Sequence, residues 1–194
     1  YKSTLLPDDV VQTYTLDEGR ANPAVSLYVT IDEATLEFKS SETKLERVHV
    51  AANLRHDQLD SVVTEEWLTN PAFEHQNDPQ RLSDLRGQLS FLYRLAKELK
   101  ARREVVRGKP ENFNRPDYNF RLVRDDGQGG EPQGDEVVQI GERRRGAPLD
   151  LIVSEAMILA NSHWGGFLAE HGVPGIYRSQ ASMAPGIKVR MGTK

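Results

Sequence analysis

The chain has 194 residues, of which 38% are hydrophobic and 28% charged, and its formal net charge is -4. These values are typical of one soluble globular domain, or a large part of one. The absence of cysteine excludes disulfides and thiolate metal sites and fits a reducing cytoplasm. The negative net charge argues against nucleic-acid binding over the whole surface.

No apolar run approaches the roughly 20 residues that span a bilayer, and the N-terminus does not read as a signal peptide. We therefore expect a cytoplasmic protein with no membrane association. The chain begins at Tyr1 rather than at Met, so we also expect it to be a fragment of a longer protein or a processed chain.

The first elements along the chain are predicted strands. Apolar residues alternate with polar ones from Val25 to Ile31, the period of two that is typical of a half-buried strand. A short turn over residues 32–34 leads to a second strand over 35–39, and a third follows over 45–50. The pattern predicts a three-stranded antiparallel β meander within residues 20–52.

Residues 55–194 are predicted to be helical and mixed. The apolar spacing lengthens over 55–68, which predicts a helix that ends before Pro71. The residues expected on its buried face are Leu59, Val62, Val63 and Trp67. Leucines between Leu82 and Leu99 predict a long amphipathic helix whose apolar stripe is core. The sequence thus indicates an α+β fold, an antiparallel sheet with packed helices, in a single domain spanning residues 1–194.

Two further strands are expected over 119–123 and 137–140. The segment between them, 125–134, contains four glycines and a proline and is predicted to be a mobile hairpin tip. It is not a Walker-type phosphate loop, because no Lys-Ser/Thr pair opens a helix after it.

The last predicted helix carries one acidic residue among apolar ones. Apolar residues recur at helical spacing from Ile152 to Ala160, so most of the helix circumference is expected to be buried. Burying a carboxylate without a partner is costly. Glu155 must therefore lie on an exposed strip, pair with a cation, or reach a polar cavity in which it functions.

The sequence of this region resembles that of the RNB catalytic domain of the ribonuclease II and ribonuclease R family of 3'-to-5' exoribonucleases. That family's helix reads V-x-E-x-M-x-x-A-N and leads to a Tyr-Arg strand. The matching residues here are Val153, Glu155, Met157, Ala160, Asn161, Tyr177 and Arg178. Three other stretches agree in order: TLLPDD over 4–9, RPDYNF over 115–120 and KVRMGT over 188–193.

The resemblance implies hydrolysis of single-stranded RNA from its 3' end, releasing nucleoside monophosphates with the help of divalent metal, expected to be Mg2+. The family's metal-binding aspartate run, D-x-x-x-x-x-D-x-D-D, precedes its T-M-L-P entry. Its catalytic arginine lies in a later S-P-x-R-[RK]-Y segment. We therefore expect no catalytic residue and no metal ligand within this chain, which would instead supply the wall of the RNA channel.

The resemblance also implies particular RNA contacts. The family's glutamate at the position of Glu155 contacts the 3'-terminal nucleotide. His56 takes the place of a stacking tyrosine, since LRHDQL stands where the family reads L-V-Y-D-Q-V. Phe113 is a candidate for stacking on bases, whereas Tyr118 in the following strand is expected to be core. Arg178 is suited to bidentate binding of a phosphate.

Two basic stretches are candidates for phosphate contacts. One comprises Arg143, Arg144 and Arg145, just before the last helix, and the other comprises Lys97, Lys100, Arg102, Arg103, Arg107 and Lys109. Both stretches fit equally well as a solvated loop and a solvated helix end, where cations complement the helix dipole.

Two alternatives to the exonuclease remain open. One is a catalytically inactive RNB-like module that binds RNA or serves as a scaffold. The other is an unrelated enzyme that uses Glu155 together with a histidine, although no His, Asp and Ser spacing here resembles a known site.

Overall fold

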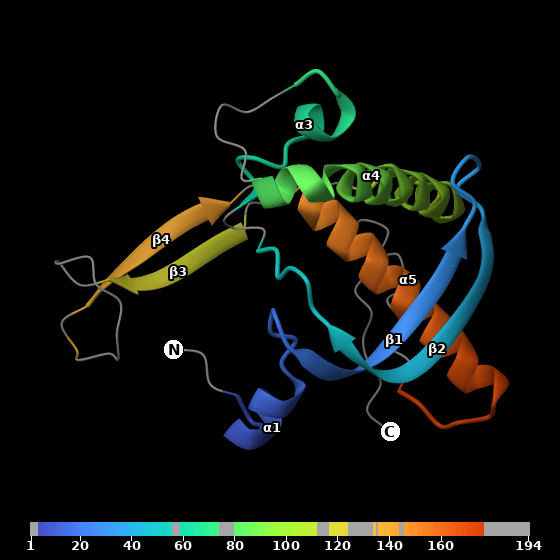
Figure 1. The fold of residues 1–194 in the computed structure, drawn as a ribbon, viewed down its shortest axis with the longest axis horizontal. Helices are drawn as coiled ribbons and strands as arrows, with labels where there is room; N and C mark the ends of the chain where they lie inside the picture. The colour runs from blue at the N-terminus through green and yellow to red at the C-terminus, as the bar shows by residue number, and fades with distance from the viewer. Residues whose placement is uncertain are drawn as a thin grey trace, which may run out of the picture. The chain divides into compact units, whose positions relative to one another are not determined.

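The computed structural model describes residues 4–55, 59–73, 80–111, 117–123, 134, 136–143 and 146–176. Within them it has four helices and two separate two-stranded antiparallel sheets (Figure 1). This confirms the α+β class. The chain divides into two compact units, Tyr1–Met157 and Ile158–Lys194. The single domain over 1–194 stays a prediction.

A long β-hairpin dominates the start of the first unit. Helix α1 (Asp8–Tyr14) precedes strand β1 (Ala21–Ile31), which pairs antiparallel with β2 (Phe38–His49) (Figure 1). The turn expected at residues 32–34 is confirmed, because the side chain of Asp32 accepts hydrogen bonds from the N–H groups of Ala34 and Thr35, both at 3.0 Å.

The three-stranded meander was a wrong prediction, because β2 is one continuous strand from Phe38 to His49. The predicted strands over 35–39 and 45–50 leave out the polar run over 40–44. Its side chains are exposed along β2, and a two-stranded ribbon accommodates Ser, Thr and Lys on its open surface.

The core of the first unit forms where α3 (Glu65–Thr69) packs on α4 (Gln80–Arg107). Val63 and Trp67 are fully buried there, and Leu59 and Val62 pack against them, so the predicted core residues are confirmed. The predicted helix over 55–68 was too long. The Thr64 side chain accepts a hydrogen bond from the Trp67 N–H at 3.2 Å, and this cap begins the helix only at residue 65.

Helix α4 buries most of its leucine stripe, as expected: Leu82, Leu89 and Leu95 are buried, whereas Leu92 is 41% exposed. Two polar side chains fasten α4 to the segment that contains α3. Arg86 Nε donates to the Trp67 carbonyl at 2.9 Å, and Ser90 Oγ donates to the Leu68 carbonyl at 2.8 Å.

The second sheet pairs β3 (Asp117–Val123) with β4 (Val137–Arg143), as the sequence predicts (Figure 1). Tyr118 is 52% exposed, so the expectation that it is core was wrong. Large apolar side chains on both strands, such as Phe120 and Ile140, are also exposed, because a two-stranded ribbon has two open faces. The predicted tip over 125–134 lies outside the described residues except for Gly134.

Helix α5 (Pro148–Glu170) belongs to both units. In the first unit Leu149 is buried in the core, and Leu151 and Ile152 pack against it. Val153 and Met157 are 54% and 59% exposed, so the expectation of burial around most of the circumference was wrong. Helical spacing identifies a surface that can be covered, but not what covers it.

In the second unit α5 ends at Glu170 and is followed by Gly172, whose φ of +62° lies in the left-handed region that suits glycine. The Val173 N–H donates to the Leu168 carbonyl at 2.9 Å, and the Gly172 N–H donates to that of Ala169 at 3.2 Å. These two bonds form a Schellman motif that closes the helix. Within the described residues, no helix is both long enough and apolar enough to cross a membrane.

Candidate functional site

Glu155 is one of the two buried residues of α5 that the structure identifies, and only 3% of it is exposed. The carboxylate ion-pairs with the Nη2 group of Arg103, which lies near the C-terminal end of α4. Glu155 was expected on an exposed strip, beside a cation or in a polar cavity. The structure shows that it pairs with a cation. This contact joins two helices that are 52 residues apart in sequence.

Arg103 holds a second carboxylate with the same nitrogen, because its Nη2 group donates to Glu111 Oε2 at 2.7 Å. Glu111 is itself fixed just beyond α4: its N–H donates to Glu104 Oε1 at 2.7 Å, and Arg107 approaches its carboxylate at 3.4 Å. We call Arg103, Glu111 and Glu155 the carboxylate cluster. It ties the end of α4 and the residues that follow it to the middle of α5.

Pairing within the cluster shifts the pKa values of Arg103 and Glu111. The hydrogen bond from Arg103 lowers the pKa of Glu111 below its ordinary value. The hydrogen bond to Glu111, together with the pairing with Glu155, raises the pKa of Arg103, so the guanidinium stays protonated. The Nε atom of Arg103 is buried and has no hydrogen-bond partner among the described residues, which offsets part of this stabilisation.

Of the other residues predicted to bind RNA, His56, Phe113, Arg144, Arg145 and Arg178 lie outside the described residues. Arg143 is the last residue of β4, but its side chain is not described. The structure therefore does not test whether these side chains converge with Glu155, and their RNA contacts stay predictions.

The basic stretch along α4 is largely paired with carboxylates. Lys97 reaches Glu65 at 2.9 Å and Arg102 reaches Glu98 at 2.8 Å. Further pairs form between Lys100 and Glu104 and within the carboxylate cluster. These pairs favour the alternative that this stretch is a charged helix surface.

The described residues do not form a metal centre. Among them, no group of three or more His, Asp or Glu side chains is close enough to hold a metal ion. The described residues therefore do not provide a ligand set for the Mg2+ that the resemblance implies.

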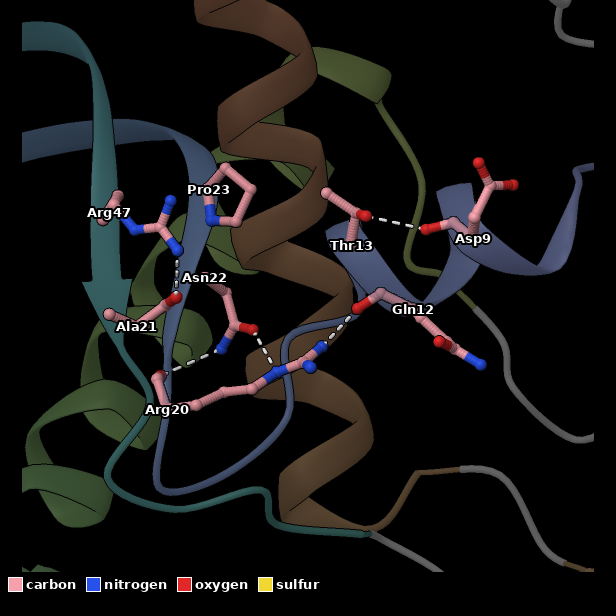
Figure 2. A pocket seen from close by; sticks show the side chains of 8 residues that line it. All are labelled: Asp9, Gln12, Thr13, Arg20, Ala21, Asn22, Pro23 and Arg47. Carbon is pink, nitrogen blue, oxygen red and sulfur yellow. Dashed lines mark hydrogen bonds between the residues drawn. The ribbon is translucent and has the colours of Figure 1, made fainter.

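A pocket of about 580 Å3 lies between α1 and the start of the hairpin (Figure 2). Its polar lining comes from α1, β1, β2 and the turn between α1 and β1. The polar residues are Asp9, Gln12, Thr13, Arg20, Asn22 and Arg47. We call this space the α1 pocket.

Asn22 is a buried residue in the wall of the α1 pocket, with only 1% of it exposed. Its amide nitrogen donates to the Asp17 carbonyl at 2.9 Å. The amide nitrogen also donates to the Arg20 carbonyl at 3.1 Å, and the amide oxygen accepts from Arg20 Nε at 2.7 Å (Figure 2). These residues were not predicted to form a site. The available signal was the Asn-Pro pair at residues 22–23, since Asn binds nearby backbone groups and Pro marks the first residues of a strand.

Comparison with known proteins gives one match. The family model described as "RNB domain" matches residues 2–187 of the chain, which include α1, the hairpin, the carboxylate cluster and the stretches TLLPDD and RPDYNF, whereas KVRMGT over 188–193 lies beyond the match. No curated protein and no solved structure matches the chain.

Proposed function

We propose that this chain is part of a 3'-to-5' exoribonuclease, because it belongs to the RNB domain family. Membership of the family implies a ribonuclease-type, RNA-degrading function. The finer proposal is that the whole protein acts in the cytoplasm and hydrolyses single-stranded RNA to nucleoside monophosphates with Mg2+. This chain contributes part of the RNA-channel wall, and the metal ligands lie elsewhere in the protein.

The observation that carries the proposal is the family match, because it covers the α5 helix and with it Glu155. In this proposal Glu155 binds the 3'-terminal nucleotide by accepting hydrogen bonds from its ribose hydroxyls. A carboxylate has about four acceptor positions, so the Arg103 contact leaves others for a ligand. Because Glu155 is 3% exposed, a nucleotide reaches it only when the side chain or its surroundings shift.

Arg103 has a defined part in this mechanism. A buried carboxylate without a cation would take up a proton or draw in water, and it would then be a poorer acceptor for hydroxyl groups. The Arg103 guanidinium is the cation that pairs with Glu155, and Glu111 in turn holds Arg103 in place. The cluster therefore orients the carboxylate on α5.

One observation favours a second candidate, the inactive RNB-like module. The Arg103 pair explains the presence of Glu155 without any RNA, since two helices joined by a buried ion pair are a structural arrangement in their own right. In that case the domain binds RNA or a protein and does not degrade it.

Degradation of end-labelled RNA by the full-length protein separates the candidates. With Mg2+, a 3' label should be released at once as a mononucleotide, while 5'-labelled RNA shortens step by step. EDTA should stop both reactions. RNA that is bound but not shortened would favour the scaffold, and early release of a 5'-terminal mononucleotide would contradict the proposed direction.

A further inference from the structure

The α1 pocket contains two arginines with different surroundings. Arg20 is used by the fold: its Nη2 group donates to the carbonyls of Gln12 and Thr15, at 2.5 and 3.1 Å, and it pairs with Asp17 at 3.1 Å. Through these contacts Arg20 fastens the C-terminal end of α1 to the start of β1. The charge of Arg20 is therefore already compensated.

Arg47 lies on β2, opposite Pro23 in the strand register, and its charge is not compensated in this way. Among the described residues it makes a single side-chain hydrogen bond, from Nη2 to the Ala21 carbonyl at 3.1 Å, and no ion pair. A guanidinium has five N–H donors, so most of those on Arg47 remain for a ligand. The bond to Ala21 orients the group at the pocket (Figure 2).

Asp9 is the second charged group without a counter-charge. It lies in the first turn of α1 and makes no ion pair with any other described residue. With the charge of Arg20 taken up by Asp17, the α1 pocket offers one unpaired cation and one unpaired anion. A simple anion would satisfy Arg47 but would be repelled by Asp9.

We propose that the α1 pocket binds one nucleotide unit, with its phosphate on Arg47 and a hydroxyl or amino donor of its sugar or base on Asp9. A guanidinium fork matches the geometry of a phosphate, and a carboxylate accepts from hydroxyl and amino groups. The volume of about 580 Å3 lies within the usual range for small-molecule sites and exceeds the needs of a bare phosphate.

The choice of a nucleotide rests on the proposed RNA function, since the same pair of charges also suits other phosphate esters that carry hydrogen-bond donors. Two sources supply the chemistry: a free nucleoside monophosphate, or a nucleotide within an RNA strand. In the first case the pocket senses the product of degradation, and in the second it holds the strand.

The test is titration of this chain with AMP and, separately, with a short oligoadenylate, followed by NMR of the Asn22 side-chain amide and the Arg47 Nε–H. Both signals should shift with at least one of the two probes. Arg47→Gln should weaken that binding about tenfold, because it removes the phosphate contact. Lys44→Gln is the matched control: it removes the same charge from the same strand, at a residue already paired with Glu42 at 3.0 Å, and should change affinity less than about twofold.

Each outcome decides the proposal. Shifts with AMP that a competing oligoadenylate displaces, or shifts with the oligoadenylate alone, support it and identify the source. Unshifted Asn22 and Arg47 signals with both probes would overturn it, as would equal losses for the Arg47 and Lys44 variants. RNA degradation that survives such a failure would leave the proposed function intact, whereas pocket binding without degradation by the full-length protein would count against that function alone.

Discussion

Replacing Arg103 with alanine isolates the contribution of the carboxylate cluster. In the native chain the Nη2 group of Arg103 binds both Glu155 and Glu111. The variant would leave the Glu155 carboxylate 3% exposed without its cation, and Glu111 would lose its contact at 2.7 Å. The consequence should be a loss of folding stability rather than a change of fold.

The size of the expected stability loss follows from the burial of the ion pair. Removing one partner of a fully buried ion pair costs about 3–5 kcal/mol, because the other charge is left buried. A quarter of the Arg103 side chain is exposed, so water can partly replace it. We therefore expect a loss of about 2–3 kcal/mol for Arg103→Ala. Glu155→Gln keeps a hydrogen bond to Arg103 and should cost about 1 kcal/mol.

Urea unfolding followed by circular dichroism measures these losses as changes in the free energy of unfolding. Arg102→Ala is the matched control, since Arg102 is the neighbouring residue but pairs with Glu98 on the surface, and it should cost less than about 0.5 kcal/mol. If Arg103→Ala were no more damaging than Arg102→Ala, the reasoning from a buried, coupled pair would be refuted.

Three further predictions concern stability and ionisation. Thr64→Ala should lower the free energy of unfolding by about 1 kcal/mol, because the Trp67 N–H loses its cap; urea midpoints equal to wild type would mean that this cap does not stabilise α3. Since Arg103 lowers the pKa of Glu111, the stabilisation by ionised Glu111 is present above the ordinary value of 4.5 and is lost as the pH falls through the lowered one. The stability advantage of wild type over Glu111→Gln should therefore shrink in acid, and an advantage that stays constant down to the acid transition would contradict the pairing. Burial raises the pKa of Tyr93 to about 12, so ultraviolet titration should show a tyrosine ionising near that pH, and Tyr93→Phe should abolish that step.

The sequence predicted the core better than the boundaries of the elements. Val63 and Trp67 were expected in the core and are fully buried, because their spacing reports which side chains share a face. The start of α3 was missed, since the apolar spacing continues upstream of the Thr64 cap. Periodicity does not show where backbone N–H groups find their partners.

The candidate site was only partly visible in the sequence. An acidic residue at position 155 within an apolar helix indicated a carboxylate in need of explanation, and the structure places it in the protein interior. Its partner could not be predicted, because Arg103 lies 52 residues away among several other cations and only tertiary packing selects it. The α1 pocket was missed for the same reason, as Asp9 and Arg47 are brought to one space only by the contact of α1 with β1 and by the pairing of β1 with β2.

We propose that Glu155 binds the 3' end of RNA. The most direct test compares the affinity of the full-length protein for RNAs that differ only in their last sugar. The RNAs would end in ribose or in 2',3'-dideoxyribose, and Kd would be measured in EDTA to prevent hydrolysis. Wild type should prefer the ribose end by about tenfold, the value of one hydrogen bond to a charged group. Glu155→Gln should bring that ratio close to one while changing the affinity for the dideoxy RNA less than about twofold. An unchanged ratio, or an equal loss of affinity for both RNAs, would contradict the account.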